Sequence, residues 1–150
     1  MSDYDELARN LRKPLAPYLL SFTEEHMGTY TPTYEGSGTP GVTTYTLQSG
    51  QYTRLGPIVY VTGTITWTAA TGTGNVRISL PLTSANTSGQ RHAGSVYTES
   101  VTFANGSIQA VNFANNNTLR LFSPATNAAS TELVIEAAGT IIFSIWYHVE

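Results

Sequence analysis

The 150-residue chain contains no cysteine and very few charged residues. Without cysteine the chain forms no disulfides and offers no thiol chemistry, so its stability must come from packing or from association with other chains. Charged residues make up 11% of the sequence, less than half the share of about 25% that is usual for soluble domains. The net charge of -3 gives no electrostatic basis for binding nucleic acid. The sequence therefore predicts a protein without disulfides and without a nucleic-acid partner.

Long apolar runs and catalytic constellations are missing as well. No stretch approaches the roughly 18 apolar residues of a membrane span, and the acidic N-terminus lacks the apolar run of a secretory leader. The three histidines, His26, His92 and His148, share no metal-ligand spacing. Glu99 is the one acid in phase with apolar neighbours, so we expect it to be partly buried beside an arginine. The acids of the β-rich part do not form the compact pair of a glycosidase: Glu35, Glu99, Glu132 and Glu136. We expect no enzymatic activity, no metal or other cofactor, and no membrane insertion.

The charged residues that do occur are concentrated in residues 1–27. This segment opens with SDYDELARNLRK, in which Ser2 is a good helix N-cap and Pro14 ends the helix. The apolar positions fall on one stripe: Tyr4, Leu7, Ala8 and Leu11. A helix of about a dozen residues is marginal alone, so we expect it to dock. It packs either on its own domain or on a larger assembly, with Tyr4, Leu7 and Leu11 as the anchor, and an extended proline-containing linker follows it.

Residues 28–150 show the pattern of short strands separated by turns. The clearest strand is Ile58–Thr68, in which Val59, Val61, Ile65 and Trp67 fall on one side and Tyr60 and a row of threonines on the other. Further strands are expected at 28–34, 42–48, 51–55, 75–82, 95–103, 108–113, 118–122, 132–137 and 140–148, with a turn at Ser49-Gly50. Polar residues 84–94 and 114–130 are expected to supply contact loops. The spacing predicts an all-β fold, an antiparallel β-sandwich of the jelly-roll type.

The last strand, Thr140–His148, is apolar on both of its faces. A strand of this kind is normally buried on both faces, whereas the outer face of a single sandwich meets water. Either the N-terminal segment or another subunit should therefore cover the outward side. We expect Ile142, Trp146 and His148 to form a subunit interface.

A few other side chains are candidates for contact with a ligand. Trp67 is in phase with the core, so we assign it to packing, whereas Tyr45 and Tyr60 are the better surface aromatics. Arg91 and His92 lie in a polar stretch that we expect to be a loop, and the arginine fork suits carboxylates or sugar acids. The candidate receptor contacts are Tyr45, Tyr60, Arg91 and His92.

The stretch YTRLGPIVYVTGTITWTAATGTGNVRISLPL resembles a segment that recurs in bacteriophage fibre and other virion-surface proteins. The shared pattern is Tyr-Thr-x-x-Gly, an alternating strand with a central glycine, a Gly-x-Gly turn and Ile-Ser-Leu-Pro. It is carried by Tyr52, Thr53, Gly56, Val59, Val61, Gly63, Ile65, Gly72, Gly74, Ile78, Ser79, Leu80 and Pro81, and it covers roughly residues 45–83. The resemblance implies a small β-sandwich that forms a homotrimer, has a structural or host-binding role and carries no catalytic residues.

Together these observations favour a virion structural protein of a fibre or of the capsid surface. Residues 1–27 would bind other virion proteins, and the sandwich formed by residues 28–150 would project as a trimer toward host surface glycans. One alternative is a capsid decoration protein that only stabilises the shell. Another is a monomeric carbohydrate-binding module, which predicts a dominant exposed aromatic platform.

Overall fold

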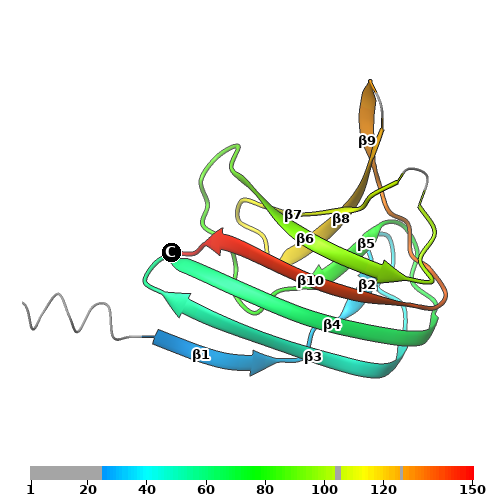
Figure 1. The fold of residues 1–150 in the computed structure, drawn as a ribbon, viewed down its shortest axis with the longest axis horizontal. Helices are drawn as coiled ribbons and strands as arrows, with labels where there is room; N and C mark the ends of the chain where they lie inside the picture. Colours follow the sequence, from blue (N-terminus) through cyan, green and yellow to red (C-terminus); the bar gives the residue numbers. More distant parts are fainter. Residues whose placement is uncertain (1–24, 104–105, 126) are drawn as a thin grey trace, which may run out of the picture.

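The computed structural model describes residues 25–103, 106–125 and 127–150, and these residues form one antiparallel β-sheet of ten strands (Figure 1). The predicted all-β, antiparallel class is confirmed. The predicted helix and its anchor residues Tyr4, Leu7 and Leu11 lie outside the described residues. The strands are β1 (Glu25–Tyr30), β2 (Tyr34–Gly36), β3 (Thr43–Leu55), β4 (Ile58–Ala70), β5 (Val76–Ser79), β6 (Arg91–Glu99), β7 (Gln109–Phe113), β8 (Thr118–Ala125), β9 (Ala128–Glu132) and β10 (Gly139–His148).

The sheet is curled, so its two edges come close to each other. The strand order is β1-β3-β4-β10-β6-β7-β8-β5-β2, with β9 paired to β8 in a hairpin that projects from the body (Figure 1). Its edge strands, β1 and β2, are joined by residues 31–33 alone. Since an extended residue spans at most about 3.6 Å, this connection keeps the two edges within a short distance. We expected one edge strand through Pro32; instead the chain leaves one edge there and enters the other.

Side chains of β3 form hydrogen bonds with the connection between β1 and β2 and with the start of β2. Gln48 donates a hydrogen bond to the carbonyl oxygen of Pro32 at 2.8 Å. The backbone N–H of Tyr34 donates to the Tyr45 hydroxyl at 2.7 Å, and Thr43 Oγ1 donates to the carbonyl oxygen of Tyr34 at 2.9 Å. Tyr45 is therefore packed against the core with its hydroxyl engaged, and it is not the free surface aromatic that we expected.

The concave side of the curl holds the core. β4 contributes Val59, Val61, Ile65 and Trp67, as the alternation predicts, and β10 contributes Ile141, Phe143, Ile145 and Tyr147. Trp67 is 1% exposed, its ring is stacked on Tyr34 with centroids 4.1 Å apart, and its indole N–H donates to the carbonyl oxygen of Glu136 at 3.0 Å. The assignment of Trp67 to packing is confirmed.

Two glycines in neighbouring strands make room for aromatic rings on the concave side. Gly50 and Gly63 are paired across β3 and β4. A Cβ atom at Gly63 would lie 2.6 Å from Cε1 of Phe143, and one at Gly50 would lie 2.6 Å from Cδ1 of Tyr30, both far inside van der Waals contact. The expected turn at Ser49-Gly50 is thus wrong, because Gly50 lies within the continuous strand β3 beneath a ring.

Other expected boundaries also shift. β6 begins at Arg91 and ends at Glu99, so Arg91 and His92 belong to a strand and the loop before them ends at Gln90. Residues 114–130, in which we expect contact loops around a strand at 118–122, contain that strand as β8 and also part of β9. The strand expected at 132–137 is absent from the described residues beyond Glu132, where β9 ends. β1 begins at Glu25, so the sheet starts slightly before the expected boundary at residue 28.

Candidate functional site

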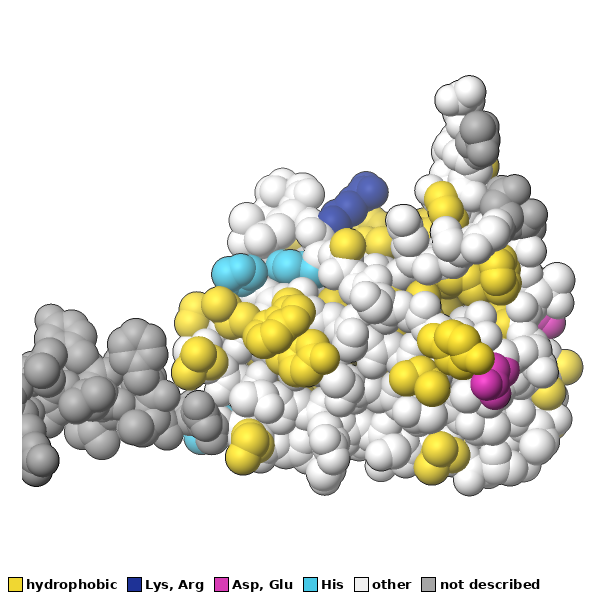
Figure 2. Space-filling view, viewed as in Figure 1, with side chains coloured by type: hydrophobic (Ala, Val, Ile, Leu, Met, Phe, Trp, Pro, Cys, Tyr) yellow, Lys and Arg dark blue, Asp and Glu magenta, His cyan; other side chains and the backbone are white. Residues whose placement is uncertain are grey.

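The convex side of β3, β4, β10 and β6 forms a broad surface with almost no charge (Figure 2). The threonine row of β4 lies here, because the alternate residues of this strand point into the core. Paired residues of neighbouring strands share a face, so Thr62 lies beside Ser144 and Gln51, and Thr64 lies beside Ile142 and Ser49. Figure 2 shows hydrophobic side chains gathered in separate groups on this face, while the few charged side chains in view lie toward its edge. The face is therefore built from hydroxyls with isolated aromatic groups.

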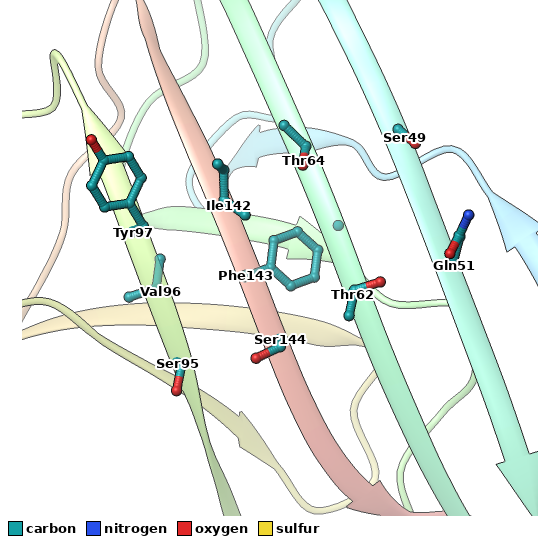
Figure 3. A pocket seen from close by; sticks show the side chains of 11 residues that line it. Ser49, Gln51, Thr62, Thr64, Ser95, Val96, Tyr97, Ile142, Phe143 and Ser144 are labelled. Carbon is teal, nitrogen blue, oxygen red and sulfur yellow. The ribbon is translucent and has the colours of Figure 1, made fainter.

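A shallow trough of about 490 Å³ runs across this face (Figure 3). Its walls are polar and uncharged, formed by Ser49, Gln51, Thr62, Thr64, Ser95 and Ser144. Gly63, Val96 and Phe143, which belong to the concave side, complete the floor, and Ile142 and Tyr97 continue the wall formed by Thr64 and Ser49. Hydroxyls both donate and accept hydrogen bonds, so the trough can match a ligand that is itself rich in hydroxyls.

Large exposed side chains flank the trough on both sides along the strand direction. Beyond the side formed by Ser144 and Thr62, the Tyr60 and Trp146 rings are stacked with centroids 4.3 Å apart, and Trp146 is 60% exposed. On the opposite side Ile142 is 44% and Tyr97 57% exposed. Trp146 and Ile142 are four residues apart on β10, a separation of about 13 Å along the strand. Tyr97 lies opposite Ile142 on β6, so the Trp146 and Tyr97 rings flank a stretch long enough for more than one small ring.

The structure brings together residues that we expected to have different roles. Tyr60, expected as a receptor contact, and Trp146, expected as a subunit contact, form one aromatic patch. Among the described residues nothing covers Ile142, Trp146 or His148, all of which lie on the convex face of β10. One patch cannot be sealed in a subunit interface and also be open to a receptor, so the two expectations exclude each other here.

Arg91 and His92 point to opposite sides of β6 and do not form a joint site. Arg91 is on the convex side, with its guanidinium 4.6 Å from the centre of the Phe113 ring. His92 is on the concave side opposite Asn112, and its Nε2 accepts a hydrogen bond from the backbone N–H of His148 at 3.3 Å. Burial lowers the pKa of His92, and the nearby His148 lowers it further. We therefore assign His92 to the structure of the sheet.

The acid that is partly buried beside arginines is Glu132 and not Glu99. Glu99 is exposed and accepts a hydrogen bond from the Tyr97 hydroxyl at 3.0 Å. Glu132 accepts a hydrogen bond from Arg77 at 2.5 Å and another from the Asn75 side chain at 2.7 Å, while Arg120 Nε lies 3.9 Å away. The sequence pattern missed this cluster because its members come from β5, β8 and β9, and only the sheet order unites them.

The described residues contain no group of three or more His, Asp or Glu side chains arranged to hold a metal ion. No helix long and apolar enough to cross a membrane occurs in the part of the chain that the structure describes. No family model matches the chain, and comparison with curated proteins and with solved structures finds no significant match. The site must therefore be interpreted from its own geometry.

Proposed function

We propose that this chain is a virion-surface structural protein whose convex face contacts host glycans. The observation that carries the glycan part is the uncharged trough with hydroxyl walls, which the exposed aromatic side chains Tyr97 and Trp146 flank. A sugar ring has an apolar C–H face and a rim of hydroxyls, so it can stack on an aromatic ring while its rim exchanges hydrogen bonds with serines and threonines. The virion setting rests on the resemblance of residues 45–83 to phage surface proteins.

In this proposal Trp146 and Tyr60 form the stacking platform, and Ser95 and Ser144 supply hydroxyls beside it. Residues 1–27 attach the protein to other virion proteins, and the curled sheet is a β-sandwich of the jelly-roll type. The ligand is held without a metal or cofactor. A decoration protein that only stabilises a shell needs no such trough, and an isolated carbohydrate-binding module needs no anchoring segment.

The experiment is an array of neutral and acidic oligosaccharides probed with the full chain and with two variants. Trp146→Ala removes the platform, and Val134→Ala is the control because Val134 is 59% exposed and lines neither the trough nor the depression beside Tyr60 and Trp146. We expect the wild type and Val134→Ala to retain the same oligosaccharides and Trp146→Ala to lose them. Retention by all three proteins, or by none, refutes the proposal.

A second candidate function for the same face is subunit contact in a homotrimer. It is favoured by the exposed apolar surface of Ile142 and Trp146, since large exposed apolar patches often mark interfaces. Light scattering at micromolar concentration separates the two candidates. A trimer that becomes a monomer on Trp146→Ala substitution supports the interface, whereas an unchanged mass leaves the face free for glycan.

A further inference from the structure

A second hollow lies on the other side of β6 from the trough. It has a volume of about 450 Å³ and lies over the convex side of β6, β7, β8 and β9. Its lining includes Arg91, Val111, Phe113 and Phe122. Ala93 lines this hollow and also the smaller depression beside Tyr60 and Trp146. Because Ala93 has only a methyl group, no large side chain at that position separates the two regions.

Arg91 presents unused hydrogen-bond donors to this hollow. Its guanidinium lies over the Phe113 ring at 4.6 Å, and it has no hydrogen bond or ion pair with any other described residue. Stacking uses the flat face of a guanidinium and leaves the N–H groups at its edge free. A carboxylate accepts two parallel hydrogen bonds from such an edge.

The surroundings of Arg91 hold more positive than negative charge. The Arg120 guanidinium lies 4.4 Å from the centre of the same Phe113 ring, and its Nε is buried without a hydrogen-bond partner. Glu132 is 3.9 Å from that nitrogen, but its two oxygens already accept hydrogen bonds from Arg77 and Asn75. Burial is the main cause that lowers the pKa of Arg120; Arg77 and Arg91 lower it further, and Glu132 opposes them.

Glu35 is too far from Arg91 to change this balance, and the nearer Glu150, two residues beyond His148, accepts a hydrogen bond from the backbone N–H of Asn86 at 3.1 Å. Glu35 lies opposite Arg77 in the β2–β5 ladder. The order β6-β7-β8-β5-β2 puts β2 four strands from β6, roughly 19 Å away at the usual spacing of strands. At that distance an exposed charge is largely screened at physiological salt.

We propose that this hollow is an anion subsite that binds the carboxylate of an acidic sugar through Arg91. The inference rests on the proposed function, because the adjacent aromatic platform and trough would hold the rest of the same glycan. The apolar floor of Val111 and Phe122 suits the C–H face of a sugar ring better than the flexible backbone of an acidic peptide. The preferred ligand class is therefore a glycan with a uronic-acid or sialic-acid unit.

The test is an NMR titration of the full chain with glucuronate, galacturonate and N-acetylneuraminate, each compared with its methyl ester. The ester keeps the sugar and removes the charge. We expect at least one acid to bind about tenfold more tightly than its ester, the gain typical of a charge-assisted hydrogen bond, with the largest shifts at Arg91 and Ala93. Arg91→Gln should abolish this preference. Arg54→Gln should retain it, since Arg54 lies on β3 and donates to the backbone of Gly56 and Glu150.

The outcomes separate this inference from the function on which it rests. If acids and esters bind equally, or if the preference survives Arg91→Gln, the anion subsite is refuted while glycan binding stands. If none of these sugars binds and the oligosaccharide array is also empty, both proposals fail. Binding of tetraglutamate at Arg91 in place of the sugars overturns the inference in favour of an acidic peptide.

Discussion

Replacing Gly63 by alanine tests the packing beneath the trough. Whether the substitution raises or lowers the free energy of unfolding depends on the contact between the new methyl group and the Phe143 ring. Gly63 has an ordinary strand conformation, so alanine fits its backbone. Without a clash the substitution would stabilise the protein by about 0.4–1 kcal/mol, since it restricts the unfolded chain. With the Phe143 ring in place the new methyl would lie 2.6 Å from Cε1, and the ring would have to move by about 1 Å to restore normal contact.

Phe143 has little freedom to make that movement. It is 3% exposed and lies on the central strand β10, which pairs with β4 on one side and β6 on the other. Overpacking of a core typically costs about 1–3 kcal/mol. We therefore expect Gly63→Ala to lower the free energy of unfolding by about 1–2 kcal/mol. For a chain of this length the melting temperature should fall by about 2–4 °C for each kcal/mol lost.

The assay is urea unfolding of a double-mutant cycle with Gly63→Ala, Phe143→Ala and the combined variant. Phe143→Ala alone should cost about 3–5 kcal/mol through the cavity it leaves. The methyl group that Gly63→Ala adds would partly fill that cavity, so the double variant should be more stable than the sum predicts by at least about 0.5 kcal/mol. Gly106→Ala is the control, since no atom lies within 4 Å of its added Cβ. A stabilising Gly63→Ala, or strict additivity, would refute the reasoning.

Two further predictions concern buried polar groups. Tyr34→Phe should lower the free energy of urea unfolding by about 1–3 kcal/mol, because the Tyr34 hydroxyl accepts a hydrogen bond from the backbone N–H of Glu136 at 2.9 Å. Tyr60→Phe on the surface should change the free energy of unfolding by less than about 0.5 kcal/mol. Equal effects of the two substitutions would contradict the stabilising role of the Tyr34 hydroxyl. The second prediction concerns pH. The pKa of His92 is lower in the folded state than in the unfolded chain, so the unfolded chain binds the proton at a higher pH. The free energy of unfolding should therefore fall as the pH drops below about 6.5 toward the lower pKa of the folded state. His92→Gln should reduce that fall, and an unchanged pH profile of unfolding would show that other groups cause it.

Sequence periodicity was sufficient to assign the two faces of the long strands. The alternation in Ile58–Thr68 and Thr140–His148 predicted the buried sets of β4 and β10, including Trp67, because a period of two is a local property of each strand. The same alternation placed Tyr60 and Trp146 on the outward side. It could not show that they stack, since that contact depends on the pairing register of β4 with β10.

Features that depend on sheet order could not be derived from the sequence. Ser49-Gly50 is typical of a turn, but Gly50 accommodates the Tyr30 ring from β1. Arg91 and His92 follow a polar stretch and were assigned to a loop, although they begin β6. The acidic partner of Arg77 and Arg120 could not be predicted either, because Glu132 reaches them only once β5, β8 and β9 lie side by side. Long-range pairing, which a local pattern does not encode, explains each of these errors.

The most direct test of the central claim is an NMR titration that follows the two indole N–H signals of the chain. The titrant is the oligosaccharide that the wild-type chain retains best on the array. The account predicts that the Trp146 signal shifts with saturation, whereas the signal of buried Trp67, whose N–H is bonded to the Glu136 carbonyl, stays in place. A Trp146 signal that does not move while the oligosaccharide binds elsewhere would contradict the assignment of the convex face as a glycan site.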